Sequence, residues 1–133
     1  MKIAFYSDTF LPQVNGVVRS LVTMAETLRD RGHAIEIHTT TDPKPAELPG
    51  VATVRYPSFM LPHYPQYRVV VPTFRRWRRI AHPPDVIHSY TSFGVGWEAV
   101  AAAKHLRRPL VGTHHTLAEK YRTPNLGQKV KNF

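Results

Sequence analysis

The polar loop SDTFLPQVNG, residues 7–16, ends in residue types that can hold an anionic group. Asn15 is a good N-cap, and apolar residues repeat at helical spacing from Val17 onward. The start of such a helix carries unpaired N–H groups and the positive end of the helix dipole. Because Gly16 has no Cβ, a phosphate or a sugar can approach that backbone closely. The alternative is that Asn15 and Gly16 only cap and turn the chain, since one glycine is weaker evidence than a complete phosphate-binding motif.

Other polar residues lie where predicted strands end. Asp8 and Tyr90 each follow or close a strand, and a further strand ends in His114 and His115. Adjacent strand residues point to opposite faces, so these two histidines do not share a metal ion, and we predict no metal site. One of them can face a ligand while the other packs. His88, inside a strand, is interpreted as a core or near-core histidine.

Several common sites are absent from the sequence. It has no G-x-G-x-x-G after the first strand, no G-x-x-x-x-G-K-[ST] and no G-x-S-x-G, which argues against dinucleotide, P-loop and α/β-hydrolase sites. The lack of cysteine excludes disulfides and thiolate metal sites, and it fits the cytoplasm. No run approaches the roughly 20 apolar residues of a membrane span, and the first residues do not match a signal peptide.

Residues 1–133 are expected to form one Rossmann-like α/β domain, with a doubly wound, mainly parallel sheet flanked by helices. A continuous apolar run followed by a helical repeat and an alternating run gives a β-α-β unit. The ligand site below is placed on the condition that the strand order is 3-2-1-4-5. The predicted strands are Ile3–Tyr6, Ala34–Thr40, Val51–Tyr56, Asp85–Tyr90 and Pro109–Thr113, and the helices begin near Val17, Pro72 and Val95. The segment Ser58–Val71 resists assignment.

In an open parallel sheet, ligands bind beyond the carboxyl ends of the strands, where the strand order reverses. Here that place lies between the first and fourth predicted strands. The loops Asp8–Gly16 and Tyr90–Gly96 should meet there, with the end of the fifth strand beside them. Gly94 and Gly96 can open a second helix toward a ligand, or they can serve close packing of that helix on the sheet.

Positive charge is concentrated in one part of the chain. Lys and Arg number 18 and Asp and Glu number 9, giving a net charge of +9, and no acidic residue occurs between Leu48 and Pro84. This predicts an anionic partner surface, either nucleic acid or lipid. On a helix over Pro72–His82, one arc would be apolar and the other basic, as in helices that lie on anionic membranes. The alternative is an ordinary amphipathic helix that covers the sheet. The residues of the predicted membrane-binding face are Phe74, Arg75, Arg76, Trp77, Arg78 and Arg79.

Three stretches, MKIAFYSDTFLPQVNGVVRSL, RGHAIEIHTTTDP and PDVIHSYTSFGVGWEAVAAAKHLRRPLVGTHHT, resemble the N-terminal domain of family 4 glycosyltransferases of the GT-B fold. The resemblance covers nearly the whole chain in the correct order. Within the family, SDTFLPQVNGV, HTTTDP and THHTLAEKY are most similar to bacterial lipid glucosyltransferases that act on diacylglycerol. Related mannosyl- and sulfoquinovosyltransferases share much of the pattern.

The resemblance implies two Rossmann-like domains that face each other, with the acceptor in the N-terminal one and most of a nucleotide sugar, such as UDP-glucose, in the other. By position, the backbone of Gly16 would meet the donor diphosphate, with Asn15 and Asp8 shaping the loop. His115 would be the catalytic-site histidine that contacts the donor sugar or orients the acceptor. The segment Ser58–Arg79 would form the lipid and membrane face.

The resemblance also implies a C-terminal nucleotide-sugar domain that this sequence does not contain, so we expect the isolated chain to be inactive and to bind no cofactor. Its uncovered face could lead to self-association. We therefore predict the acceptor half of a retaining glycosyltransferase, cytoplasmic and peripherally bound to anionic membrane, that moves a hexose to a lipid. One alternative is a basic Rossmann-like module that binds nucleic acid or membrane without catalysis, although we expect no nucleic acid. The other is a family 4 transferase with a soluble acceptor.

Overall fold

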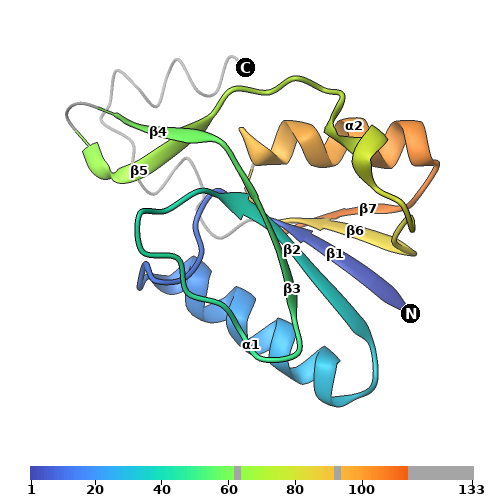
Figure 1. The fold of residues 1–133 in the computed structure, drawn as a ribbon. Helices are drawn as coiled ribbons and strands as arrows, with labels where there is room; N and C mark the ends of the chain where they lie inside the picture. Colours follow the sequence, from blue (N-terminus) through green and yellow to red (C-terminus); the bar gives the residue numbers. More distant parts are fainter. Residues whose placement is uncertain (62–63, 92–93, 114–133) are drawn as a thin grey trace, which may run out of the picture.

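The computed structural model describes residues 1–61, 64–91 and 94–113. A five-stranded parallel sheet with the order β3-β2-β1-β6-β7 forms the centre, with α1 and α2 on opposite faces (Figure 1). This confirms the predicted Rossmann-like fold class, and the strand order is the one on which the placing of the ligand site depended. The elements are β1 (Lys2–Tyr6), α1 (Gly16–Asp30), β2 (Ala34–Thr40), β3 (Ala52–Tyr56), β4 (Ser58–Leu61), β5 (Tyr64–Val70), the 3-10 turn η1 (Arg76–Arg79), β6 (Val86–Ser89), α2 (Val95–Leu106) and β7 (Leu110–Gly112).

Strand β1 is buried on both faces, as its unbroken apolar sequence predicts. Ile3 and Phe5 pack in the core on the α1 side, whereas Ala4 and Tyr6 pack in the core on the α2 side. Alternate residues of a strand point to opposite faces, so one short strand contributes to both cores. This places the carboxyl end of β1 firmly between the two helical layers.

The segment that resisted assignment forms a separate hairpin of β4 and β5. Its strands are antiparallel, and Ser58 pairs with Val70. Arg68 donates to both the side-chain and the carbonyl oxygen of Ser58, at 2.8 and 3.1 Å. Arg68 therefore holds the hairpin together and does not stand free as part of a basic surface.

The predicted helix over Pro72–His82 is wrong, because only the single turn η1 forms there. Phe74 has φ +59°, a left-handed conformation that an α-helix cannot contain, and Ile80 is already extended. The apolar spacing that suggested a helix serves packing instead, since Trp77 stacks on His105 of α2 with ring centroids 4.6 Å apart. Arg76 turns inward to α2 and does not lie on the exposed basic side.

Candidate functional site

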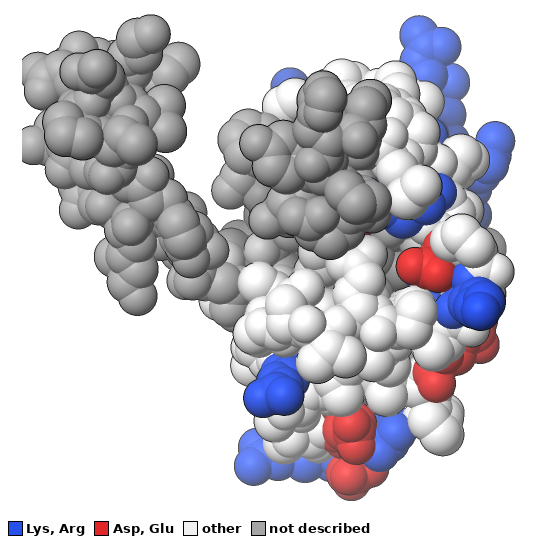
Figure 2. All heavy atoms as spheres, turned by 90° about the vertical axis from the view of Figure 1, so that its left-hand side faces the viewer, with Lys and Arg blue, Asp and Glu red and all other residues white. Residues whose placement is uncertain are grey.

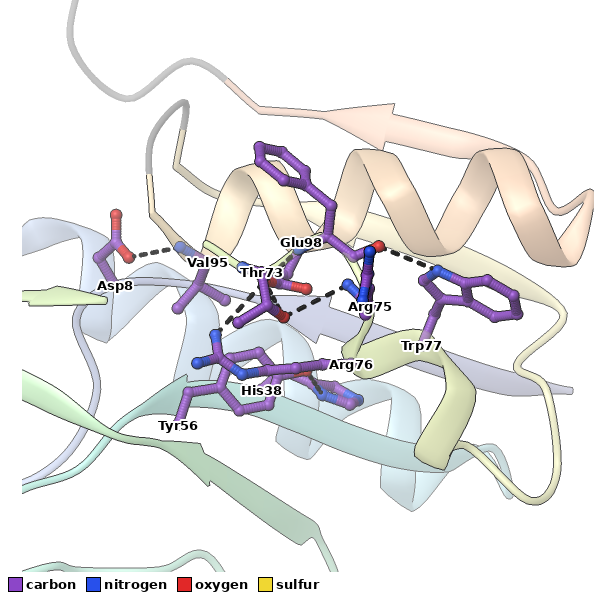
Figure 3. A network of polar contacts seen from close by, with 10 residues as sticks. Asp8, His38, Tyr56, Thr73, Arg75, Arg76, Trp77, Val95 and Glu98 are labelled. Atoms are coloured by element: carbon purple, nitrogen blue, oxygen red, sulfur yellow. Dashed lines mark hydrogen bonds and ion pairs between the residues drawn. The ribbon is translucent and has the colours of Figure 1, made fainter. Parts of the chain in front are cut away.

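The two loops expected to converge at the reversal of strand order do meet. Asp8 follows β1, and its Oδ1 accepts a hydrogen bond from the backbone N–H of Val95, the first residue of α2, at 2.9 Å (Figure 3). Gly94 has φ +55°, and a Cβ there would lie 2.7 Å from the same oxygen. The contact therefore requires glycine at position 94. Asp8 thus fixes the start of α2 against the end of β1, at the sheet edge where parallel α/β proteins bind ligands.

The Asp8 carboxyl group lies in an unfavourable place for a charge. Burial raises its pKa from the ordinary value of 3.8 to about 6, although the hydrogen bond from Val95 opposes that rise. At neutral pH the group is therefore largely ionised, and a negative charge faces the first turn of α2. The positive end of the helix dipole favours that arrangement.

The raised pKa of Asp8 predicts how stability varies with pH. A carboxyl group whose pKa is higher in the folded state stabilises the fold fully below its unfolded pKa, and this contribution is lost as pH rises through about 6. Asp8→Asn keeps an oxygen that can accept from Val95 and does not titrate. We expect this variant to be more stable than wild type at pH 7, by on the order of 2 kcal/mol, and equally stable near pH 4.

The measurement is urea unfolding at several pH values from 4 to 7, with the free energies of variant and wild type subtracted at each pH. Asp30→Asn is the control, since the Asp30 side chain is 70% exposed. A constant difference between Asp8→Asn and wild type across this range would contradict the prediction.

The N-terminus of α1 is capped by a side chain, and its first residue is exposed. The Oδ1 of Asn15 accepts from the N–H of Val18 at 2.9 Å, which confirms the predicted N-cap. Gly16 is exposed, and among the described residues no heavy atom outside its chain neighbours and its own helix backbone lies within 4 Å of where its Cβ would be. Packing therefore does not require glycine at this position. Because the packing of the described residues does not explain a glycine here, its position at an exposed helix N-terminus favours close approach by a ligand.

The start of α2 differs from that of α1. A Cβ at Gly96 would lie 2.2 Å from the carbonyl oxygen of Thr91. That distance leaves no room for any side chain, so this glycine serves close packing of α2 on the preceding loop. The sequence left open whether Gly94 and Gly96 open a helix toward a ligand or allow close packing of that helix. Close packing accounts for both glycines.

Tyr90, predicted to line the ligand crevice, lies in the core instead. It is 4% exposed, its ring lies beside those of Phe5 and His88, and burial raises its pKa. The ring lies on the α1 side of the sheet because the alternation of buried faces along β6 continues one residue beyond its end at Ser89. His88 is a near-core histidine, as predicted, and its Nε2 contacts Oγ1 of Thr113. His114 and His115 fall outside the described residues.

The sequence did not single out the buried carboxylate of Glu98, which has several partners among the described residues. Glu98 of α2 is 1% exposed, and its Oε1 accepts from the backbone N–H of Thr73 at 2.6 Å and of Phe74 at 3.0 Å (Figure 3). Arg76 adds an ion pair at 3.3 Å, and its guanidinium lies 4.9 Å from the ring centroid of Tyr56. One signal was available, because Glu98 is the only acidic residue in an otherwise alanine-rich helical segment.

A second missed cluster lies on the α2 face of β2 and β3. The ring of His38 stacks on Tyr6 at 4.3 Å, and its nitrogens contact Glu36 and the hydroxyl of Tyr56. Burial raises the pKa of both tyrosines, whereas contact with His38 lowers that of Glu36. The cluster borders a pocket of about 330 Å³ that Arg76 and Arg79 also line. These groups satisfy one another, so the cluster is a polar core.

Comparison with known proteins decides the family. A family model described as Glycosyltransferase Family 4 matches residues 14–133. The chain belongs to glycosyltransferase family 4. The match includes Asn15, Gly16 and the whole of α2, and it begins after β1 and Asp8.

Two curated family 4 relatives are similar to nearly all of the chain. An alpha-monoglucosyldiacylglycerol synthase of Streptococcus pneumoniae is 33% identical over 123 residues, which is 91% of this chain and 28% of that protein. A GDP-mannose-dependent alpha-mannosyltransferase of Mycobacterium tuberculosis is 36% identical over 122 residues, which is 87% of this chain and 32% of that protein. The chain thus spans about a third or less of the length of each.

A solved structure supports the fold. The sucrose-phosphate synthase of Thermosynechococcus elongatus matches with a TM-score of 0.55 and 19% identity, covering 92% of this chain and 35% of that one. The sheet therefore agrees with the Rossmann-like fold expected for one domain of a GT-B glycosyltransferase. In the part of the family 4 chain that the structure describes, no helix is both long and apolar enough to cross a membrane.

Proposed function

We propose that the chain is the acceptor-side half of a retaining glycosyltransferase that moves a hexose from a nucleotide sugar to a membrane lipid. Glucose from UDP-glucose is the first candidate donor group, and diacylglycerol is the first candidate acceptor. The name of the Streptococcus pneumoniae relative supports this choice. The second candidate donor is GDP-mannose, which the Mycobacterium tuberculosis relative favours. In this proposal a separate domain reads the nucleotide.

The observation that carries the proposal is the open N-terminus of α1 at Gly16, on the sheet edge where Asp8 fixes α2. Retaining transfer develops negative charge on the leaving diphosphate. Backbone N–H groups and the helix dipole stabilise such charge where they are fixed beforehand. Asn15 keeps this helix start in place by its bond to Val18. His115 follows β7 in the sequence, and we assign it to the donor sugar or the acceptor.

Charge supports the membrane part of the proposal. Figure 2 shows Lys and Arg at the upper right-hand edge of one face, whereas lower on that face Lys and Arg lie among Asp and Glu. Arg75, Arg78 and Arg79 are exposed, and no acidic side chain within the described residues pairs with them. Each such group near an anionic bilayer contributes on the order of 1 kcal/mol. Arg76, which pairs with Glu98, is left out of this surface.

Co-sedimentation with vesicles tests the lipid partner. The triple change of Arg75, Arg78 and Arg79 to Gln should weaken binding to phosphatidylglycerol vesicles roughly 100-fold, because about 1 kcal/mol is lost at each position. The matched control changes the same charge elsewhere, at the exposed residues Arg19, Arg31 and Lys44. Equal losses in the two triple variants would mean that the attraction is not local. No binding of wild type to any vesicle would favour a soluble acceptor.

A further inference from the structure

An aromatic pair lies exposed where the segment before η1 runs along α2. The rings of Phe74 and Trp97 lie nearly parallel, with centroids 6.4 Å apart, and their exposed fractions are 51% and 42%. The two residues are 23 positions apart in the sequence. Trp97 was not among the residues that the basic segment suggested, because it belongs to α2. Folding therefore creates an apolar surface that neither segment has alone.

The backbone of Phe74 has a strained, left-handed conformation. Its φ of +59° is uncommon for any residue except glycine. The carboxylate of Glu98 accepts the N–H groups of both Thr73 and Phe74 and so holds this conformation (Figure 3). A buried carboxylate thus fixes an exposed aromatic side chain in a strained conformation. Such strain is often found at functional surfaces.

The outer face of α2 continues the apolar surface. Val100 is 51% exposed and lies one turn after Trp97, and the exposed Lys104 lies one turn further. The opposite face of this helix packs in the core through residues such as Val95, Ala99 and Ala102. The exposed face of α2 therefore changes from apolar to basic along its length.

Cations border this surface, and no exposed carboxylate belongs to α2 or to the segment beside it. Arg75 and Arg78 are exposed on that segment, whereas Glu98 is buried and paired. A second copy of the chain placed face to face would bring these positive charges together, which disfavours self-association here. An apolar centre with a basic border is complementary to the interfacial layer of an anionic bilayer.

Trp77 has a different position. Its ring stacks on His105, and its Nε1 donates to the carbonyl oxygen of Phe74 at 3.0 Å. Those contacts fasten η1 to α2. We infer that the surface that enters the bilayer interface is formed by Phe74, Trp97 and Val100, with Arg75, Arg78 and Lys104 at its border, and that Trp77 stays outside the lipid. This inference rests on the proposed lipid function and names the contact surface.

The two tryptophans allow a direct test, because the chain has no others. Trp77→Phe leaves only Trp97, and Trp97→Phe leaves only Trp77. Each variant is mixed with phosphatidylglycerol and phosphatidylcholine vesicles that carry brominated acyl chains. Trp97 emission should shift to shorter wavelength and be quenched, and Trp77 emission should change in neither way. Trp97→Ala should weaken vesicle binding roughly ten-fold or more, whereas Met24→Ala, an exposed position on α1, should not.

The outcomes separate the two proposals. Vesicle binding without any change in Trp97 emission overturns this surface and leaves the membrane function standing. Quenching of Trp77 alone overturns it too. A shift of Trp97 emission that depends on protein concentration and needs no vesicles means that a second copy covers the surface, and it overturns the inference. Failure to bind any vesicle overturns this inference together with the membrane part of the proposed function.

Discussion

Gly16→Val is expected to lower glycosyl transfer roughly 100-fold or more in an enzyme that carries this chain, with no loss of stability beyond about 1 kcal/mol. The structure explains why activity should fall while stability is kept. No described heavy atom outside the chain neighbours and the backbone of α1 lies within 4 Å of a Cβ at position 16, so the fold has room for a side chain there. A diphosphate approaching the N-terminus of α1 would meet that side chain and lose the backbone N–H donor. Turnover and thermal unfolding of variant and wild type are compared.

The matched control for Gly16→Val is Thr23→Val, which places the same residue at an exposed position of the same helix. We expect the control to transfer sugar at the wild-type rate. If Gly16→Val does the same, Gly16 only begins the helix, and the phosphate contact must be sought elsewhere. If Gly16→Val unfolds, the open space around position 16 has been misjudged.

Glu98→Ala is expected to cost the domain about 3–5 kcal/mol, the usual effect of removing one partner from a buried ion pair. The loss should lie at the upper end of that range, because the backbone N–H groups of Thr73 and Phe74 lose their acceptor as well. Since the free energy of unfolding of a small domain is only about 5–15 kcal/mol, this variant should lose a large part of its stability. Urea unfolding of the variant measures the cost directly.

Two further variants separate the roles of Glu98. Glu47→Ala changes an exposed carboxylate and should stay within about 0.5 kcal/mol of wild type. Changing both Arg76 and Glu98 to Met removes both charges of the pair. Apolar replacement of a buried ion pair is often neutral, yet here the two N–H groups would remain unpaired, so this variant should stay destabilised. Wild-type stability in the double variant would show that the ion pair alone mattered.

The strands of the parallel sheet could be predicted from the sequence because the patterns that indicate them depend on neighbouring residues. The apolar run of β1, the N-cap at Asn15 and the alternation in β2 each depend on neighbouring residues, and the parallel order follows from the β-α-β connections. The meeting of Asp8 with the start of α2 follows from the same topology, since both lie at the carboxyl edge of adjacent strands β1 and β6.

The conformation of residues 72–82 could not be predicted from the neighbouring residues in the sequence. Its spacing of Phe74, Trp77 and Ile80 matches a helix, but a carboxylate more than 20 residues away fixes the backbone in another conformation. A helical wheel assumes that the helix exists. It therefore placed Arg76 on the exposed side, although the structure pairs it with buried Glu98.

The most direct test of the account asks whether this chain chooses the acceptor. It is joined in turn to the C-terminal parts of the Streptococcus pneumoniae synthase and the Mycobacterium tuberculosis mannosyltransferase, in place of the residues it matches. Each folded fusion receives labelled UDP-glucose or GDP-mannose with diacylglycerol vesicles and a panel of soluble acceptors. The account predicts that both fusions label diacylglycerol and that the sugar follows the C-terminal part. Labelling of soluble acceptors only, or an acceptor that changes with the C-terminal part, would contradict it.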